Sequence, residues 1–594
     1  MMHDRFVQLI AAVVMAVCLG VSGTLLPAII DQSDDRALRY TDVSVEGAPP
    51  FVALGTVIGA VRGLIVDYLW IKVNIQKEKG LFYEVMADAD LITKLQPRFA
   101  AVWVFHGHNM AYNISVATHT QTERWEWVQK GIRLVRDEGI RHNPNDLLLH
   151  KELAFWFAHK IDGYADDAHL YYKTQFCREW HLLLGLPPDD YQERIAWIKE
   201  VADAPETLDE AERRVEGVKQ LVEDLRAAYP PNQPVPFGLN RDLLNQYTWW
   251  KVFKEQSAAA RILGAAERMR AESSYFTALD NLATDPARQD QWKALLSHVR
   301  KRVLREEYNM DPQLMYEYTR DLGPLDWRHP QAHGIYWSRR GSQFGEPRVP
   351  DDEVYRVINN DRIQVQGMQA LSRTGRMVFD PFSSDMPARF PDPRWIDTID
   401  REFERLYIKH FDAPGAGGDT FIDFLKNYLS SAIRQWYREG EREKAQQLMD
   451  RLDSLFGTGA QIPNDQYKIP LDVFVRNETR EQYQSQPYLA PSDVMAALRH
   501  GYLAGIVHNR PDILQGAVRF ADEVTEYFQN NEYFDFNSKF GTGRMRDLIT
   551  QINESAVVVF AQLMIDRTID IEDRLTLWAQ VDRHIPDLRV RVYD

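Results

Sequence analysis

The densest group of side chains that could bind a ligand lies between residues 326 and 337. Its members are Asp326, Trp327, Arg328, His333 and Trp337. The Arg328 guanidinium could clamp an anion through two hydrogen bonds. The same residue types also suit a corner between helices, where Asp326 and Arg328 satisfy helix ends and the tryptophans pack. We favour the corner, with His329 capping the helix that begins at Pro330.

Histidines gather in a second region that could hold a metal ion. They are His106, His108, His142, His150, His159 and His169, with Asp166 among them, and His329 and His333 lie four residues apart. Imidazoles one helical turn apart can share a metal. However, no HExxH motif occurs, and the only cysteines are Cys18 and Cys177. We therefore expect capping, packing and surface roles, and no metal.

Motifs of common enzyme classes are missing from the chain. The glycine-rich stretch Pro414–Thr420 lacks the Gly-Lys-Ser/Thr ending of a phosphate-binding loop, so it is interpreted as a connector. Neither a nucleophile elbow, a dinucleotide fingerprint nor a haem-attachment motif is found. We expect no catalytic residue and no cofactor, so the chain is not predicted to be an enzyme.

Composition bounds the class of partner. Of the 594 residues, 45% are hydrophobic and 26% are charged, as expected for a folded chain rather than a disordered one. The net charge is −16, whereas binding to a nucleic-acid backbone needs a positive field. Nucleic acid is therefore excluded as a partner, and other proteins are expected instead.

The N-terminus carries an apolar run long enough to span a bilayer. Residues 6–30 contain no charge, and 25 helical residues extend for about 37 Å against a hydrocarbon core of about 30 Å. A cleaved signal peptide is the alternative, although its apolar region is usually shorter. We predict a single-pass signal anchor in a bacterial-type inner membrane. The flanking basic residues do not fix its orientation, and the body is expected outside the cytoplasm.

A second apolar stretch covers residues 51–73. Arg62 and Asp67 interrupt it, and charges are costly within lipid. A buried or interfacial helix is therefore favoured over a second membrane-embedded segment.

The remaining chain shows apolar residues at helical spacing, punctuated by helix-start signals. Thr207 and Glu210 form a capping box ahead of a helical face that runs from Ala211 to Leu225. Asp285-Pro286 and Asp311-Pro312 each pair an N-cap residue with a proline at the first helical position. Alternating strand patterns are few, so the fold class is predicted to be all-α.

Proline spacing suggests an internal repeat. Pro97 and Pro144 each precede a helix start and lie 47 residues apart (144 − 97 = 47), one repeat of about 34 residues plus an insertion of about 13. Such stacked helix pairs would bury their faces against one another.

Here the residues resemble the tetratricopeptide (TPR) repeat. The matching positions are Trp103 and Gly107 in one segment, Leu153, Ala154 and Phe157 in the next, Gly80 and Pro97 in an earlier partial unit, Trp436, Gly440, Ala445, Met449 and Leu452 in a later hairpin, and, more weakly, Ala517, Ala521, Val524 and Phe528. His106 replaces the expected leucine, and the match covers about a third of the body by repeat period. Generic helix-hairpin packing remains the alternative.

The resemblance implies a solenoid with a partner-binding groove lined by first helices. At the groove positions stand His108, Tyr112, Lys151, Phe155 and His159. An extended peptide or a partner helix could lie there. Neighbouring helices that fill this face are the alternative.

These features predict seven segments. They are a flank at 1–5, the anchor at 6–30, a linker at 31–50, a first TPR-like region at 51–190, a middle helical region at 191–350, connecting helices with the glycine-rich loop at 351–420, and a second TPR-like region at 421–594. The predicted function is a membrane-anchored scaffold that assembles a membrane or envelope complex. The alternative is a helical enzyme or ligand-binding protein that uses the 326–337 corner or the histidines.

Overall fold

Helices dominate the structure, and the all-α prediction is confirmed. The computed structural model describes residue 14 and residues 59–230, 236–255, 274–379, 381, 386–411, 417–438, 440–530, 533–566 and 569–593. The chain forms two compact units, residues 1–102 and 103–594. The predicted anchor at 6–30, the linker at 31–50 and part of the glycine-rich loop lie outside the described residues.

The described part of the first unit is a helical hairpin made of α3 (Gly59–Glu78) and α4 (Phe82–Leu95). Their contact buries Val66, Leu69, Val73, Val85, Ala89 and Ile92. Lys72 pairs with Asp88 at 2.9 Å across the hairpin. On α3, Leu64, Tyr68 and Ile71 remain exposed. The described part of the predicted 51–73 stretch therefore has one buried apolar face and one exposed apolar face.

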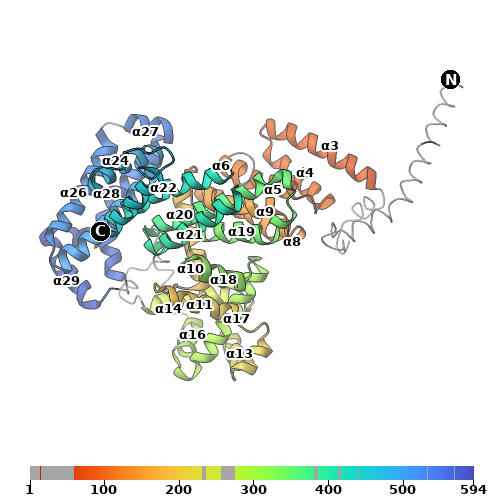
Figure 1. Cartoon of the computed structure of the whole chain (residues 1–594). Helices are drawn as coiled ribbons and strands as arrows, with labels where there is room; N and C mark the ends of the chain where they lie inside the picture. Colours follow the sequence, from red (N-terminus) through yellow and green to blue (C-terminus); the bar gives the residue numbers. More distant parts are fainter. Residues whose placement is uncertain are drawn as a thin grey trace. The chain divides into compact units, whose positions relative to one another are not determined.

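The helices of the second unit are shown in Figure 1. The first set comprises α5 (Ala100–His108), η1 (Asn109–Ile114), α6 (Ser115–Ala117), α7 (Gln121–Arg133), η2 (Leu134–Gly139), α8 (Ile140–His142), α9 (Leu147–Phe155), η3 (Trp156–Ile161), α10 (His169–Leu184), α11 (Tyr191–Ala202), α12 (Leu208–Arg214), α13 (Val218–Ala228), α14 (Arg241–Glu255), α16 (Ser274–Thr284), η5 (Pro286–Arg288), α17 (Gln289–Glu306), α18 (Pro312–Leu322) and α19 (Pro330–Phe344).

The second set begins with two short helices and includes a small sheet. It comprises η6 (Glu346–Arg348), η7 (Asp351–Glu353), α20 (Tyr355–Thr374), β1 (Arg376–Val378), β2 (Ala388–Phe390), η8 (Pro393–Trp395), α21 (Ile396–His410), α22 (Gly417–Arg438), α23 (Arg442–Phe456), α24 (Leu471–Ser485), η9 (Pro487–Leu489), α25 (Ala490–Tyr502), η10 (Leu503–Val507), α26 (Pro511–Asn530), α27 (Tyr533–Phe540), α28 (Thr542–Ile565), α29 (Ile571–His584) and α30 (Leu588–Tyr593).

Two successive helix pairs near the start of this unit each have a six-residue π-helical segment in their first helix. These segments, η1 and η3, begin 47 residues apart (156 − 109 = 47). This period equals the Pro97–Pro144 spacing. At the first pair, Gly107 and Gly131 let the two helices touch, because a Cβ on Gly131 would lie 2.6 Å from the Gly107 carbonyl oxygen. The two π-helical segments thus have the same spacing as the two prolines.

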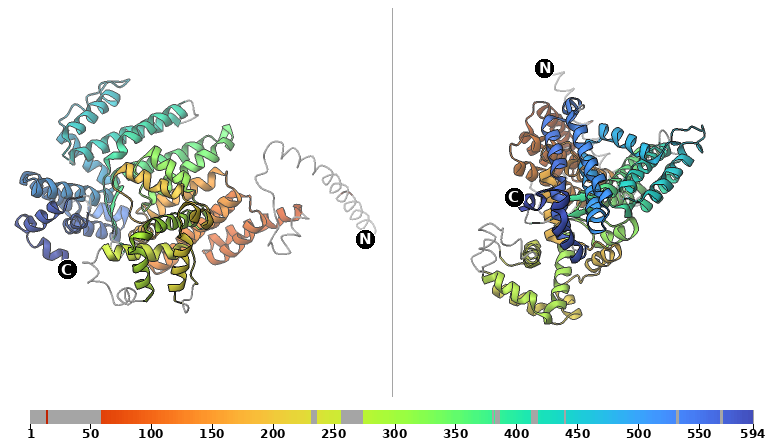
Figure 2. Two further views of the ribbon diagram at one scale, coloured as in Figure 1. Left: turned by 90° about the horizontal axis from the view of Figure 1, so that it is seen from below. Right: turned by 90° about the vertical axis from the view of Figure 1, so that its left-hand side faces the viewer.

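The helix-start signals of the middle region are largely confirmed. Thr207 accepts a hydrogen bond from the Glu210 amide, and Asp311 accepts one from the Gln313 amide. The predicted single helix from Ala211 to Leu225 is wrong. The chain forms α12 and α13 there, because Gly217 adopts a left-handed conformation (φ 92°) between them. Helices α13 to α17 form one group, drawn in yellow to light green in both views of Figure 2.

The predicted hairpin at Gly440 is also confirmed. Helices α22 and α23 meet there, and Gly440 supplies a positive φ of 84° at the turn. Ala445, Met449 and Leu452 are buried in the cluster that this hairpin forms with α24.

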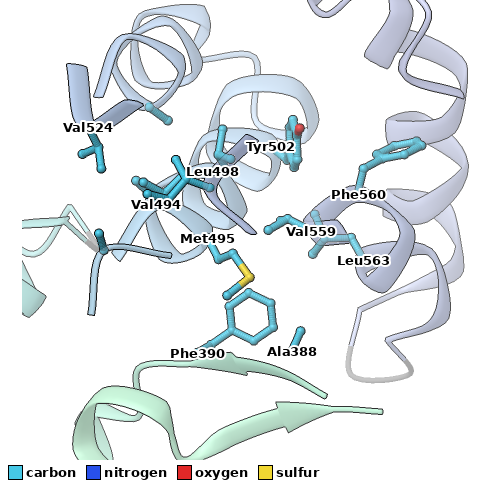
Figure 3. Packing of buried hydrophobic residues seen from close by; sticks show 14 of the residues in the cluster. Ala388, Phe390, Val494, Met495, Leu498, Tyr502, Val524, Val559, Phe560 and Leu563 are labelled. Atoms are coloured by element: carbon cyan, nitrogen blue, oxygen red, sulfur yellow. The ribbon is translucent and has the colours of Figure 1, made fainter. Parts of the chain in front are cut away.

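The C-terminal helices share one hydrophobic core that the β-hairpin closes (Figure 3). Strands β1 and β2 are antiparallel, with Met377 opposite Arg389. Ala388 and Phe390 point into the core beside Met495, as Figure 3 shows. Because side chains alternate along a strand, Arg389 and Met377 belong to the other face, where Met377 packs against Cys177 of α10. The hairpin therefore has one face on the C-terminal core and the other face toward α10.

Helix α28 is long and apolar enough to cross a membrane by length and composition. Met545, Ile552, Val559 and Leu563 on this helix are buried in the C-terminal core. The same burial pattern is typical of a core helix in a soluble domain.

Candidate functional site

The predicted groove residues lie on the first helices of the two repeated pairs. The rings of His108 and Tyr112 stack at 4.5 Å, those of Tyr112 and His159 at 6.0 Å, and those of Phe155 and His159 at 4.8 Å. The Tyr112 hydroxyl lies 3.3 Å from His159 Nδ1. We call these four residues the aromatic ladder. Lys151 is outside it and pairs with Glu152.

The aromatic ladder is only partly exposed. Phe155 is 38% exposed and His159 is also exposed, whereas His108 and Tyr112 are half-buried. Burial and the neighbouring Lys160 ammonium lower the pKa of His159. The lowered pKa favours the neutral form of His159 near pH 7.

The 326–337 corner is part of the protein core. Asp326 is 1% exposed, and Arg328 is 3% exposed. Arg328 Nε donates to Asp326 Oδ1 at 2.9 Å, and Nη2 donates to Oδ2 at 2.6 Å. Burial opposes ionisation of Asp326, yet Arg328 and Arg194 hold its pKa at about 2. The Arg328 guanidinium is thus engaged by its own chain, and an external anion has no access to it.

The other corner residues have packing roles. His333 Nε2 donates a hydrogen bond to the Trp327 carbonyl oxygen at 2.9 Å, and burial lowers the pKa of His333 to about 3. The Trp180 ring lies 4.2 Å from the His333 ring, and Trp337 stacks on His150. His329 accepts a hydrogen bond from the Gln331 amide, which confirms the predicted N-cap.

The histidine-rich region does not converge on one point. His142 stacks on Trp103, and His150 is hydrogen-bonded to the Pro144 carbonyl at 2.8 Å. Asp166 binds the Lys160 ammonium at 2.6 Å. Among the described residues, no three His, Cys, Asp or Glu side chains are arranged to hold a metal ion.

A cavity of about 160 Å³ lies elsewhere in the second unit, and we call it the Arg389 pocket. Its lining comes from the segment before α10 and α10 itself (Asp162, Tyr164, His169, Leu170, Lys173), α20 (Ala370, Arg373, Thr374), the β-hairpin (Met386, Arg389), η9 and α25 (Pro487, Tyr488, Leu489, Pro491, Ser492, Met495), and α27 and α28 (Phe540, Arg544, Met545, Leu548, Gln551). Five parts of the fold therefore build this pocket.

Arg389 has an unfilled hydrogen-bonding edge in this pocket. Its side chain is 8% exposed, and Nη1 donates to Asp162 Oδ1 at 2.5 Å. Nε and Nη2 are buried and have no hydrogen-bond partner among the described residues. Leaving buried donors unpaired is costly, and native proteins contain few of them. These two atoms are the candidate ligand-binding group.

Other arginines of the chain show what this edge binds. Arg136 donates from Nε and Nη2 to the two Asp137 carboxylate oxygens, at 2.7 and 3.0 Å. Arg394 holds Asp392 in the same way, with both distances 2.7 Å. Two parallel bonds from a guanidinium to a carboxylate or phosphate give both strength and orientation. The same edge of Arg389 thus matches an anion with two oxygens.

The electrostatics of the pocket favour an anion despite the acidic chain. Lys173, Arg373, Arg389 and Arg544 line it, against Asp162 as the only acid among the lining residues described. Lys173 Nζ donates to the Gly163 carbonyl at 2.9 Å and lies 2.7 Å from His169 Nδ1. Burial lowers the pKa of Lys173 to about 7, with Asp162 acting in the opposite direction. The cationic side chains of the lining repel one another, and a negatively charged ligand would reduce that repulsion.

Sequence reasoning missed the Arg389 pocket entirely. Its polar residues come from positions as far apart as 162 and 544, and no motif joins them. One local signal was available, since Ala388-Arg389-Phe390 places a basic residue between two apolar ones, as in a buried strand. Comparisons of the chain with protein-family models, curated proteins and solved structures found no match.

Proposed function

We propose that this chain is a helical binding protein whose Arg389 pocket holds a small anion. The Nε and Nη2 edge of Arg389 carries the proposal, because Arg389 lines the cavity and these two buried donors have no partner among the described residues. Lys173 and Arg373 add positive charge to the same cavity. The proposed role of the pocket is binding alone, with no reaction step.

Replacing Arg389 by methionine tests this function. In thermal unfolding of the full chain, acetate or inorganic phosphate should stabilise the native protein as its concentration rises, because it binds the folded state only. The apparent affinity should fall at least about tenfold in Arg389→Met, the loss expected for charged hydrogen bonds.

The control variant is Arg510→Met, which removes an exposed arginine that pairs with Asp512 on the surface. This variant should keep the native anion response, with sodium chloride holding the ionic strength constant. Equal responses of the native protein and Arg389→Met, or no response of the native protein, would contradict the proposal.

The protein performs this role at a membrane. The 25 uncharged residues at 6–30 suit an uncleaved, single-pass inner-membrane anchor, with the body outside the cytoplasm. The exposed Leu64, Tyr68 and Ile71 of α3 suit contact with the lipid interface, where aromatic and aliphatic side chains are favoured.

A second candidate function is a TPR-like scaffold for a membrane or envelope complex. The aromatic ladder favours it, because equivalent positions of the two 47-residue repeats, Tyr112 and His159, stack together on a partly exposed face. An extended peptide of a partner protein would lie along this face, with its apolar side chains against the rings.

Replacing Phe155 by aspartate tests the scaffold function. Phe155 is exposed, so the change should leave folding intact but reduce recovery of partner proteins in gentle-detergent isolation by several-fold, since a buried charge opposes docking. Phe344→Asp alters a similarly exposed phenylalanine of α19 and should not change recovery. A native chain that is always isolated as a lone monomer would rule out this function.

A further inference from the structure

The Arg389 pocket is lined by apolar residues as well as by cations. Apolar residues of the lining include Leu170, Met386, Tyr488, Met495, Phe540, Met545 and Leu548. Met495, Met545 and Leu548 belong to the C-terminal hydrophobic core, and Phe540 packs against it. Lys173, Arg373 and Arg389 come instead from α10, α20 and the hairpin. Three of the four cations therefore come from outside the C-terminal helices, whereas α28 supplies Arg544 together with Met545 and Leu548.

Aromatic rings extend the apolar side. Tyr164 stacks on Tyr488 at 4.2 Å and meets Phe540 at 6.0 Å. A hydrated ion such as phosphate would satisfy the Arg389 edge but leave these rings and the methionines in contact with water. A ligand with a hydrocarbon portion would cover them, and each buried methylene raises affinity about fourfold.

We propose that the pocket takes an amphiphilic carboxylate, with its carboxylate on Arg389 and its hydrocarbon chain against Met495, Met545 and Leu548. This inference rests on the proposed anion-binding function. A carboxylate fits because guanidinium edges of this type elsewhere in the described residues, such as those of Arg136 and Arg394, hold one. The polarisable, unbranched methionines suit a flexible chain, because they adapt to irregular apolar shapes.

Isothermal titration calorimetry of the full chain in lipid nanodiscs distinguishes an amphiphilic carboxylate from a small anion as the ligand. The probes are acetate, butanoate, hexanoate, octanoate and neutral octanol, with empty nanodiscs as the blank for partitioning. Affinity should rise with chain length, and octanoate should bind about sixtyfold more tightly than acetate if three methylenes are buried. Octanol should bind at least tenfold more weakly than octanoate, because it lacks the charge that Arg389 requires.

Two pairs of variants locate the ligand. Leu170→Gln and Met386→Gln change half-buried lining residues, so each should weaken octanoate several-fold and leave acetate unchanged. Leu186→Gln, at an exposed leucine beyond α10, should alter neither. Arg389→Met should weaken both acids, and Arg510→Met should weaken neither.

The outcomes separate this inference from the proposed function. If acetate and octanoate bind native protein equally and both need Arg389, anion binding stands and the amphiphile inference is wrong. If no acid binds, or if Arg389→Met binds every acid as the native protein does, both are wrong. Octanol binding as tight as octanoate would also overturn the inference.

Discussion

Replacing Asp326 by alanine is expected to destabilise the second unit by about 3–5 kcal/mol, because it leaves the buried Arg328 charge without its partner. Asp326 and Arg328 have side chains only 2% and 3% exposed, and they share two charged hydrogen bonds. Urea unfolding followed by tryptophan fluorescence measures the effect, since Trp327, which lies between the two residues in sequence, is fully buried.

The chain contains a matched control for this substitution. Arg320 and Asp321 form the same two-bond pair, at 2.6 and 2.9 Å, but about half of each side chain is exposed. Asp321→Ala should leave the urea midpoint nearly unchanged, because water replaces the lost partner. Equal midpoint shifts in the two variants would show that burial of the Asp326–Arg328 pair does not matter to stability.

Carboxylate binding in the Arg389 pocket is expected to weaken about tenfold for each pH unit above 7, as Lys173 loses its proton. Burial lowers the pKa of Lys173 to about 7 in the empty pocket, and a bound anion raises it, so binding takes up a proton. The charged groups beside it do not titrate in this range. Burial lowers the pKa of His169 to about 2, while Arg389 and Lys173, acting against burial, keep Asp162 ionised.

Calorimetry with octanoate between pH 6 and 9 measures this dependence. Lys173→Met should flatten the profile, whereas Lys444→Met, at an exposed lysine, should leave it intact. The stability of the ligand-free protein changes with pH in the opposite direction to the binding affinity. The free energy of unfolding should rise with pH from about 7 to 10.5, because the unfolded chain still holds the proton that folded Lys173 has released. If the octanoate affinity of the native protein did not change with pH, Lys173 would not contribute to binding.

Local signals predicted the elements of the fold well. The caps at Thr207, Asp311 and His329 and the turn at Gly440 each depend on one or two residues, and all four are present. The break at Gly217 was missed, because the apolar face continues across it at helical spacing and hides the left-handed glycine.

Of the contacts between distant segments, those among the groove residues were predicted and those of the Arg389 pocket were not. The groove residues His108, Tyr112, Phe155 and His159 were predicted to share one face, and their rings do lie together. Tyr112 and His159 are 47 residues apart (159 − 112 = 47), which is also the spacing of Pro97 and Pro144. Arg389 and Lys173 share no such relation, and only the packing of α10 against the hairpin joins them. Sequence periodicity alone therefore could not reveal the pocket.

The two faces of the β-hairpin have a consequence for local unfolding. Ala388 and Phe390 are anchored among the C-terminal helices, while Arg389 between them reaches the pocket. A three-residue strand cannot release one of these side chains and keep its neighbours in place. A ligand that fixes the Arg389 guanidinium would therefore also oppose transient opening of α25 and α28. Local unfolding of the C-terminal core would then be rarer when the pocket is occupied.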